Sequence, residues 1–193
     1  MRRILFLLLF GSCVSLSAQK VKVDRIENDG RRQLMTSSKS IMLGKKEYTF
    51  SLKLFTDVIS SEWCLLISSF SYISPSAEVL IKLSNDEIIH LYCNNVNDGK
   101  INMPGYGIPI GNITYYSPAS QENYYSSIYI FSPEDLEKIE TYEIKKIRFS
   151  PGTDFYDKEF SNNTLGKFIK KGRKKILEKL KNTPTTKNIY DGF

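Results

Sequence analysis

Apolar and polar side chains alternate without a break between residues 46 and 55, and this two-residue period constrains the fold more than any other feature. The apolar positions are Tyr48, Phe50, Leu52 and Leu54, and the polar positions are Glu47, Thr49, Ser51 and Lys53. Successive side chains of a strand point to opposite faces, so this period predicts a strand with one buried face. The 12 tyrosines and 11 phenylalanines also favour sheets.

Two further segments predict hairpins. Asp29-Gly30 between residues 21–28 and 31–37 is a typical two-residue turn, which would place Glu27 opposite Arg32. Around residues 85–87, a three-residue loop collects apolar side chains on one face better than a two-residue loop does, and it moves His90 to the other face. Other strands are expected in three segments: residues 63–72, 124–131 and 144–149.

Helix signals occur twice. Ser132 can cap free N–H groups and Pro133 fits the first turn, which predicts a short helix ending near Glu140. A second helix is expected at 163–181, because apolar residues recur there at helical spacing. Its apolar stripe consists of Leu165, Phe168, Ile169, Ile176, Leu177 and Leu180, with Gly172 on the same line.

Seven or eight short antiparallel strands with these two helices predict a mainly β (α+β) fold. We expect an antiparallel sandwich or open barrel with one short helix, and with the C-terminal amphipathic helix packed on it. The predicted organisation is a single β-rich domain at 19–182, including the helix at 163–181, followed by a polar tail at 183–193. The Gly- and Pro-containing residues 94–123 are expected to form a long loop.

Residues 1–18 have the parts of a signal peptide: Arg2 and Arg3, an apolar run, and small residues up to Ala18. The apolar run is too short to span a bilayer. We therefore expect an exported protein, located in the periplasm, on the outer surface or outside the cell. A lipid anchor on Cys13 is the alternative, although the triplet before this cysteine suits lipidation poorly.

The positive charge is concentrated near the C-terminus. The whole chain carries a net charge of +6, and removal of Arg2 and Arg3 leaves +4. Residues 167–181 contain eight basic residues and one acidic residue, so the rest of the exported chain is slightly acidic. A possible anionic membrane surface is therefore one expected partner, the alternative being a solvated face. The candidate contacts are Lys167, Lys170, Lys171, Lys174 and Lys175.

The ending Leu-Ser-Ala-Gln at 16–19 is of a kind common in secreted proteins of Bacteroidetes. Residues 80–91 resemble their strand–turn–strand units, and residues 129–139 with 144–148 resemble a recurring end of such domains. The chain thus resembles secreted β-rich proteins of Bacteroidetes type over about residues 78–150. The resemblance implies an envelope or surface location and no chemistry.

The sequence contains no catalytic motif. His90 is the only histidine, and no nucleophile-elbow motif accompanies it. No metal site is predicted: Asp154, Asp157 and Glu159 lack calcium-loop spacing, and one histidine with two distant cysteines is too few ligands for zinc. The glycines at 105–111 lack the Lys-Ser/Thr of a phosphate loop. We therefore expect no catalytic residues and no cofactor.

The tyrosines in and beside the expected loop are the candidate binding residues, since tyrosine combines apolar area with a hydrogen-bonding tip. They are Tyr106, Tyr115, Tyr116, Tyr124 and Tyr125. The alternative is that they close the end of a core. An oxidising destination permits a disulfide between Cys64 and Cys93, and two free buried thiols are the other interpretation.

These observations favour a secreted or envelope-associated, non-enzymatic binding or assembly domain with a protein or glycan partner. Export argues against nucleic acid as a partner. The alternative is a small secreted hydrolase or carbohydrate-active enzyme that uses His90 or paired carboxylates.

Overall fold

The computed structural model describes residues 19–57, 59–111 and 113–182. The predicted signal peptide with Cys13, and the predicted polar tail at 183–193, lie outside the described residues.

Antiparallel strands make up most of the fold, and all of the recorded strand pairs are antiparallel. There are two helices in the described residues, α1 (Pro133–Thr141) and α2 (Thr164–Asn182). The strands, in chain order, are β1 (Val21–Ile26), β2 (Arg32–Thr36), β3 (Lys39–Leu43), β4 (Lys46–Thr56), β5 (Ser61–Ser69), β6 (Glu78–Leu83), β7 (Ile88–Met103), β8 (Tyr106–Ile110), β9 (Ile113–Ser117), β10 (Ser120–Ile130), β11 (Ile144–Ser150) and β12 (Tyr156–Glu159).

One large sheet follows the order β1-β2-β4-β5-β10-β7-β6-β11-β12, and β3 pairs with the remaining part of β4. The long strand β7 joins its two halves, because its first residues pair with β6 and its later residues pair with β10. The halves face each other across the core, where the rings of Tyr48 in β4 and Phe149 in β11 meet edge-on at 5.0 Å. Among the described strands, β1 and β12 remain the two unjoined ends, so the sheet is open.

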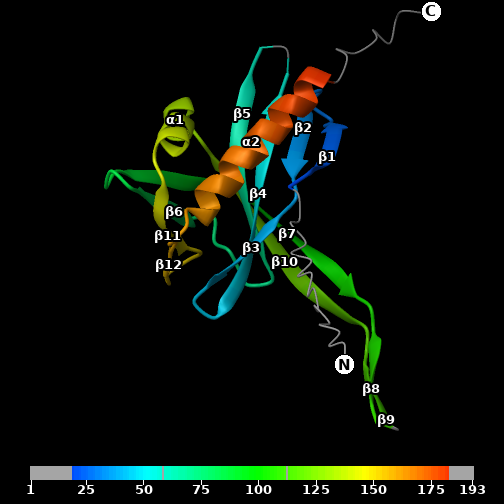
Figure 1. The fold of residues 1–193 in the computed structure, drawn as a ribbon. Helices are drawn as coiled ribbons and strands as arrows, with labels where there is room; N and C mark the ends of the chain where they lie inside the picture. The colour runs from blue at the N-terminus through cyan, green and yellow to red at the C-terminus, as the bar shows by residue number, and fades with distance from the viewer. Residues whose placement is uncertain (1–18, 58, 112, 183–193) are drawn as a thin grey trace, which may run out of the picture.

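Helix α2 covers one face of this sheet. It crosses β2, β4 and β5 diagonally in Figure 1, and it contacts β1, β2, β4, β11 and α1. Its inward side buries Leu165, Phe168, Ile169 and Ile176. Gly172 allows a close approach, because a Cβ atom at this position would lie 3.1 Å from Thr36 Cγ2. The predicted fold class, mainly antiparallel β with one short helix and a C-terminal helix packed on the sheet, is confirmed.

The start of α1 follows the sequence signal. Ser132 Oγ accepts from Asp135 N–H at 3.1 Å, and the Asp135 carboxylate accepts from Ser132 N–H at 3.0 Å. This reciprocal pair is a capping box, and Pro133 occupies the first turn. The cap fixes where α1 leaves β10.

The two predicted hairpins form, with changes in register. At the first turn Glu27 N–H donates to Arg31 O at 2.8 Å, so the loop has three residues and the expected Glu27–Arg32 pairing is wrong. Gly30 adopts φ +81°, which suits a glycine that ends a three-residue loop. At the second turn Leu83 N–H donates to Glu87 O, so the predicted three-residue loop forms one position earlier than expected. His90 lies on the face opposite the buried Ile89 and Leu91, as predicted, and the structure shows that this face is exposed.

The expectation of a long loop at 94–123 is wrong. These residues lie mostly in strands: β7 continues to Met103, β8 and β9 form a hairpin, and β10 begins at Ser120. The paired strands project from the body of the protein as a narrow ribbon (Figure 1). The long excursion therefore has regular structure, because distant backbone segments pair with each other.

Candidate functional site

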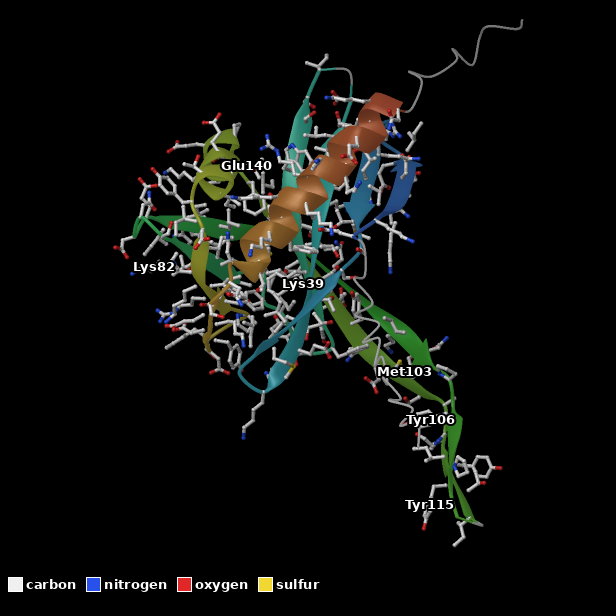
Figure 2. The ribbon with its side chains drawn as sticks, in the orientation of Figure 1. Lys39, Lys82, Met103, Tyr106, Tyr115 and Glu140 are labelled. Carbon is white, nitrogen blue, oxygen red and sulfur yellow. The ribbon has the colours of Figure 1, made fainter. Side chains whose placement is uncertain are left out.

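The feature that departs most from a compact fold is this projecting ribbon, which we call the arm and define as residues 99–124. Met103 pairs with Ser120 at the end of the β7–β10 ladder, and Tyr106 pairs with Ser117 at the start of the β8–β9 ladder. Beyond residue 99 the arm is only two strands wide, because β5 pairs with β10 only from Tyr125 onward. Met103, Tyr106 and Tyr115 lie along it, away from the body (Figure 2).

Four large apolar side chains share one face of the end hairpin, residues 106–117, which we call the tip hairpin. Ile108 pairs directly with Tyr115, and Tyr106 and Ile113 lie two positions away on their strands, so all four point the same way. Their exposed fractions are 60% for Tyr106, 48% for Ile108, 60% for Ile113 and 57% for Tyr115. The face is therefore apolar and open to solvent.

The opposite face of the tip hairpin carries Tyr116, which is 82% exposed. Its ring lies across Gly107, since a Cβ atom built on this glycine would sit 3.3 Å from Tyr116 Cε1. An aromatic side chain that covers a cross-strand glycine compensates for the missing side chain there. The apolar surface of Tyr116 thus also helps to hold β8 and β9 together.

The arm carries no charge beyond its base. The sequence has no Asp, Glu, Lys or Arg between Lys100 and Glu122. These two residues lie at the same level of the ladder, because Lys100 pairs with Asn123 and Glu122 pairs with Ile101. Soluble proteins usually protect exposed strand edges with charged side chains. The distal arm has no such protection.

The two edges of the tip hairpin differ in their free hydrogen-bonding groups. Ile110 pairs with Ile113 at the two-residue turn, and in such a turn the closing pair is hydrogen-bonded inward. The backbone groups therefore point outward at the next pair, Pro109 and Thr114, and again at Tyr116. Proline has no N–H, so the β8 edge is blunted there, whereas β9 presents complete N–H and C=O groups.

The base of the arm is held by aromatic contacts. Tyr124 meets Phe70 edge-on at 5.7 Å, and Tyr125, the next residue after the arm, meets Tyr72 at 5.4 Å. Both tyrosines are half-buried. Of the five candidate tyrosines, the structure thus places Tyr106, Tyr115 and Tyr116 at the exposed tip. The other two lie at the base, against the body.

The basic residues of α2 form a charged surface on its outer side. Lys167, Lys171 and Lys174 are exposed. Two other candidate lysines have partners: Lys175 Nζ lies 2.8 Å from the Glu178 carboxylate, and Lys170 Nζ donates to Glu140 O at 2.9 Å.

His90 lies on the outer face of the body. Its Nε2 is 3.1 Å from the Glu78 carboxylate, and its ring stacks at 4.1 Å on Tyr92. Neither neighbour is a serine or cysteine nucleophile. Among the described residues, no group of His, Cys, Asp and Glu side chains is placed to hold a metal ion.

Asp157, in the last strand of the sheet, forms ion pairs with two basic residues of β11. Both oxygens of Asp157 accept from Arg148, at 2.6 and 2.9 Å, and Lys146 Nζ lies 2.7 Å away. The Arg148 guanidinium holds the pKa of Asp157 well below its usual range, and Lys146 adds to this. Asp157 thus serves to join β11 to β12.

Cys64 and Cys93 are both free thiols. Cys64 lies on β5 and Cys93 on β7, with β10 between them. Two inter-strand spacings separate their Cα atoms by about 9 to 10 Å, more than the ~7 Å that a disulfide allows. Burial raises the pKa of Cys64 to about 12. The disulfide interpretation is therefore not supported, and Cys64 is an unreactive core side chain.

Sequence reasoning identified the tyrosines of the tip but missed Ile108 and Ile113, which complete the apolar face. One signal was available in the sequence, namely the absence of any charge between Lys100 and Glu122. A segment of this length that is exposed and uncharged is rare at a strand edge.

No protein-family model matches this chain, and neither the curated proteins nor the solved structures include a match to it. Within the part of the chain that the structure describes, no helix is both long and apolar enough to cross a bilayer.

Proposed function

We propose that this chain is an exported, non-enzymatic binding and assembly domain, and that its partner is a protein that contacts the tip hairpin. The observation that carries the proposal is the exposed apolar face of an uncharged, two-stranded hairpin that projects from the body. An isolated two-stranded hairpin is marginally stable in water, and exposed apolar patches of this kind mark interaction sites.

The chemistry of the tip favours a protein partner over a glycan. The β9 edge offers backbone N–H and C=O groups at Thr114 and Tyr116, which an extended strand of a partner can pair with. Strand addition would widen the hairpin to three strands. The partner could then also contact the apolar face that is formed by Tyr106, Ile108, Ile113 and Tyr115. A glycan site would instead need polar and charged side chains beside the aromatic rings, and the tip has no charged ones.

The surroundings of His90 do not favour the hydrolase alternative. Its side chain contacts Glu78 and Tyr92, which lie on the same exposed sheet face. A histidine that acts as a general base needs a nucleophile or substrate proton within hydrogen-bond reach. The site therefore supports binding better than catalysis.

The proposal can be tested with a photo-crosslinking amino acid at position 115, in cells that produce the protein. Position 92 is the matched control, because Tyr92 is 64% exposed but lies on the body. A protein adduct should form from position 115 and not from position 92. The identified protein, once purified, should bind wild-type protein about tenfold or more tightly than the variant Ile108→Ser/Ile113→Ser. Ile88→Ser, at an isoleucine 59% exposed, should bind like the wild type.

An adduct of twice the chain mass would identify the partner as a second copy, which also supports assembly through the tip. A glycan adduct, or equal adducts from positions 115 and 92, would contradict a protein partner at the tip. So would equal binding by the Ile108→Ser/Ile113→Ser variant and the wild type.

A further inference from the structure

The outer side of α2 carries a line of lysines that the proposed role of the tip does not use. Lys167, Lys171, Lys174 and Lys181 recur at intervals of four, three and seven residues, so they lie on one side of the helix. All four are exposed. At a rise of 1.5 Å per residue they extend over about 21 Å. We call these four residues the lysine ridge.

The positive charge of the ridge is not neutralised by ion pairs, because the nearby carboxylates are paired with other residues. The Glu140 carboxylate lies 3.2 Å from Arg173, and the Glu178 carboxylate lies 2.8 Å from Lys175. Among the described residues, none of the four ridge ammonium groups forms an ion pair, although Lys174, after Lys175, helps to lower the pKa of Glu178. The apolar stripe of α2 is buried against the sheet and the four ridge lysines are exposed, so the ridge is directed away from the body.

The surface beside the ridge is partly apolar. A shallow groove of about 820 Å³ runs between α2 and the end of α1, and lysine side chains and Leu177 line it. Leu177, which the sequence placed in the buried stripe, is 40% exposed here. Long lysine side chains keep their ammonium group in water while their methylene stems cover apolar surface.

We propose that the lysine ridge binds the surface of a bilayer that contains anionic lipids, with α2 lying flat on it. A straight, 21 Å line of cations presents its charges at one level, which suits a planar anionic surface. The exposed Leu177 and the lysine stems can enter the headgroup region beside the ridge. The tip hairpin remains free, because it projects from a different part of the molecule (Figure 1).

Two other anionic partners fit less well. Sites for single-stranded nucleic acid place aromatic side chains among the basic ones, and the outer side of α2 has none. An acidic protein partner would need directional hydrogen bonds for specificity. The ridge consists only of lysines, which are flexible point charges without the bidentate geometry of arginine.

The experiment is sedimentation of the purified protein with vesicles of roughly one-third phosphatidylglycerol in phosphatidylcholine, at about 25 mM salt. We expect binding to these vesicles and none to pure phosphatidylcholine. Each lysine near an anionic surface strengthens binding about fivefold, so Lys171→Glu/Lys174→Glu should weaken it by about 25-fold or more. The matched control Lys45→Glu/Lys158→Glu changes the net charge equally at exposed sites off α2 and should weaken it less than about threefold.

Binding should also be lost as salt rises to about 0.5 M, because screening shortens the range of the attraction. Equal losses for the two double variants would overturn the proposal, since net charge alone would then explain the binding. Absence of binding at low salt, or binding that salt leaves unchanged, would overturn it as well. If soluble polyglutamate binds the ridge and the vesicles do not, the partner is an acidic protein and the bilayer proposal is wrong.

Discussion

Tyr48→Phe is expected to stabilise the protein, although it removes a polar group from the core. The Tyr48 side chain is fully buried, and its hydroxyl has no hydrogen-bond partner among the described residues. A buried polar group without a partner costs about 1 to 3 kcal/mol. The phenylalanine ring keeps the edge-on contact with Phe149 at 5.0 Å. We therefore expect a gain of about 1 kcal/mol near neutral pH, or about 2 to 4 °C in Tm.

The advantage should grow at alkaline pH. Burial raises the pKa of Tyr48 from 10.0 to about 12, and the nearby Tyr156 and Asp154 contribute less. The folded state thus holds this proton more tightly than the unfolded state does. The stability that this raised pKa contributes to the wild type is complete below pH 10, and it is lost as the pH rises toward about 12. Because one pKa unit corresponds to about 1.4 kcal/mol, the variant should gain about 1 kcal/mol more at about pH 11.

The assay is urea unfolding of wild type, Tyr48→Phe and the control Tyr106→Phe, at about pH 7 and about pH 11. Tyr106 is 60% exposed, so its variant should match the wild type at both values. Comparison with the control removes the effects of other groups that titrate at high pH. If Tyr48→Phe lowers the free energy of unfolding by about 1 kcal/mol at neutral pH, the hydroxyl has a partner and the reasoning is refuted.

Three further predictions concern the helix, the sheet and the arm. Ile176→Ala removes a fully buried anchor of α2 and should cost about 2 to 5 kcal/mol in urea unfolding; a cost below about 1 kcal/mol would mean that α2 is not anchored there. Asp157→Asn should cost up to about 1 kcal/mol at neutral pH. The paired Arg148 keeps the pKa of Asp157 low, so this stability is present above about pH 4 and lost as the pH falls, and the difference from wild type should shrink in acid. Gly105→Ala places a Cβ atom 2.9 Å from the backbone N of Ala119, so amide hydrogen exchange should accelerate in β8 and β9 while the body stays protected. Unchanged exchange would contradict the close approach of the two backbones at Gly105.

The tip shows how far sequence reasoning reached at the candidate site. Tyr106, Tyr115 and Tyr116 could be selected because tyrosines are common in binding surfaces, and all three are exposed on the arm. Tyr124 and Tyr125 have the same composition signal, but they pack against Phe70 and Tyr72. No local pattern separates the two groups, because the difference depends on where β5 stops pairing with β10.

The arm was mistaken for a loop for a physical reason. Alternation of apolar and polar side chains arises when one face of a strand is buried and the other face is exposed to solvent. The distal arm has no buried face, and its apolar positions Tyr106 and Ile108 alternate with Gly107 and Pro109, which indicate turns, instead of with polar side chains. Its strands exist through pairing across the chain, such as Met103 with Ser120, and the prolines and glycines at the junctions suggested loop instead.

The sequence by itself determined the features that depend on near neighbours. The alternation at 46–55 predicted β4, Ser132 and Pro133 predicted the start of α1, and the apolar spacing at 163–181 predicted α2, since these signals act over a few residues. Only the tertiary structure decided how segments that are distant in the sequence are arranged relative to one another. It placed β10 between Cys64 and Cys93, and it extended residues 99–124 into solvent. Those outcomes depend on the pairing of strands that are distant in the sequence, which local patterns do not encode.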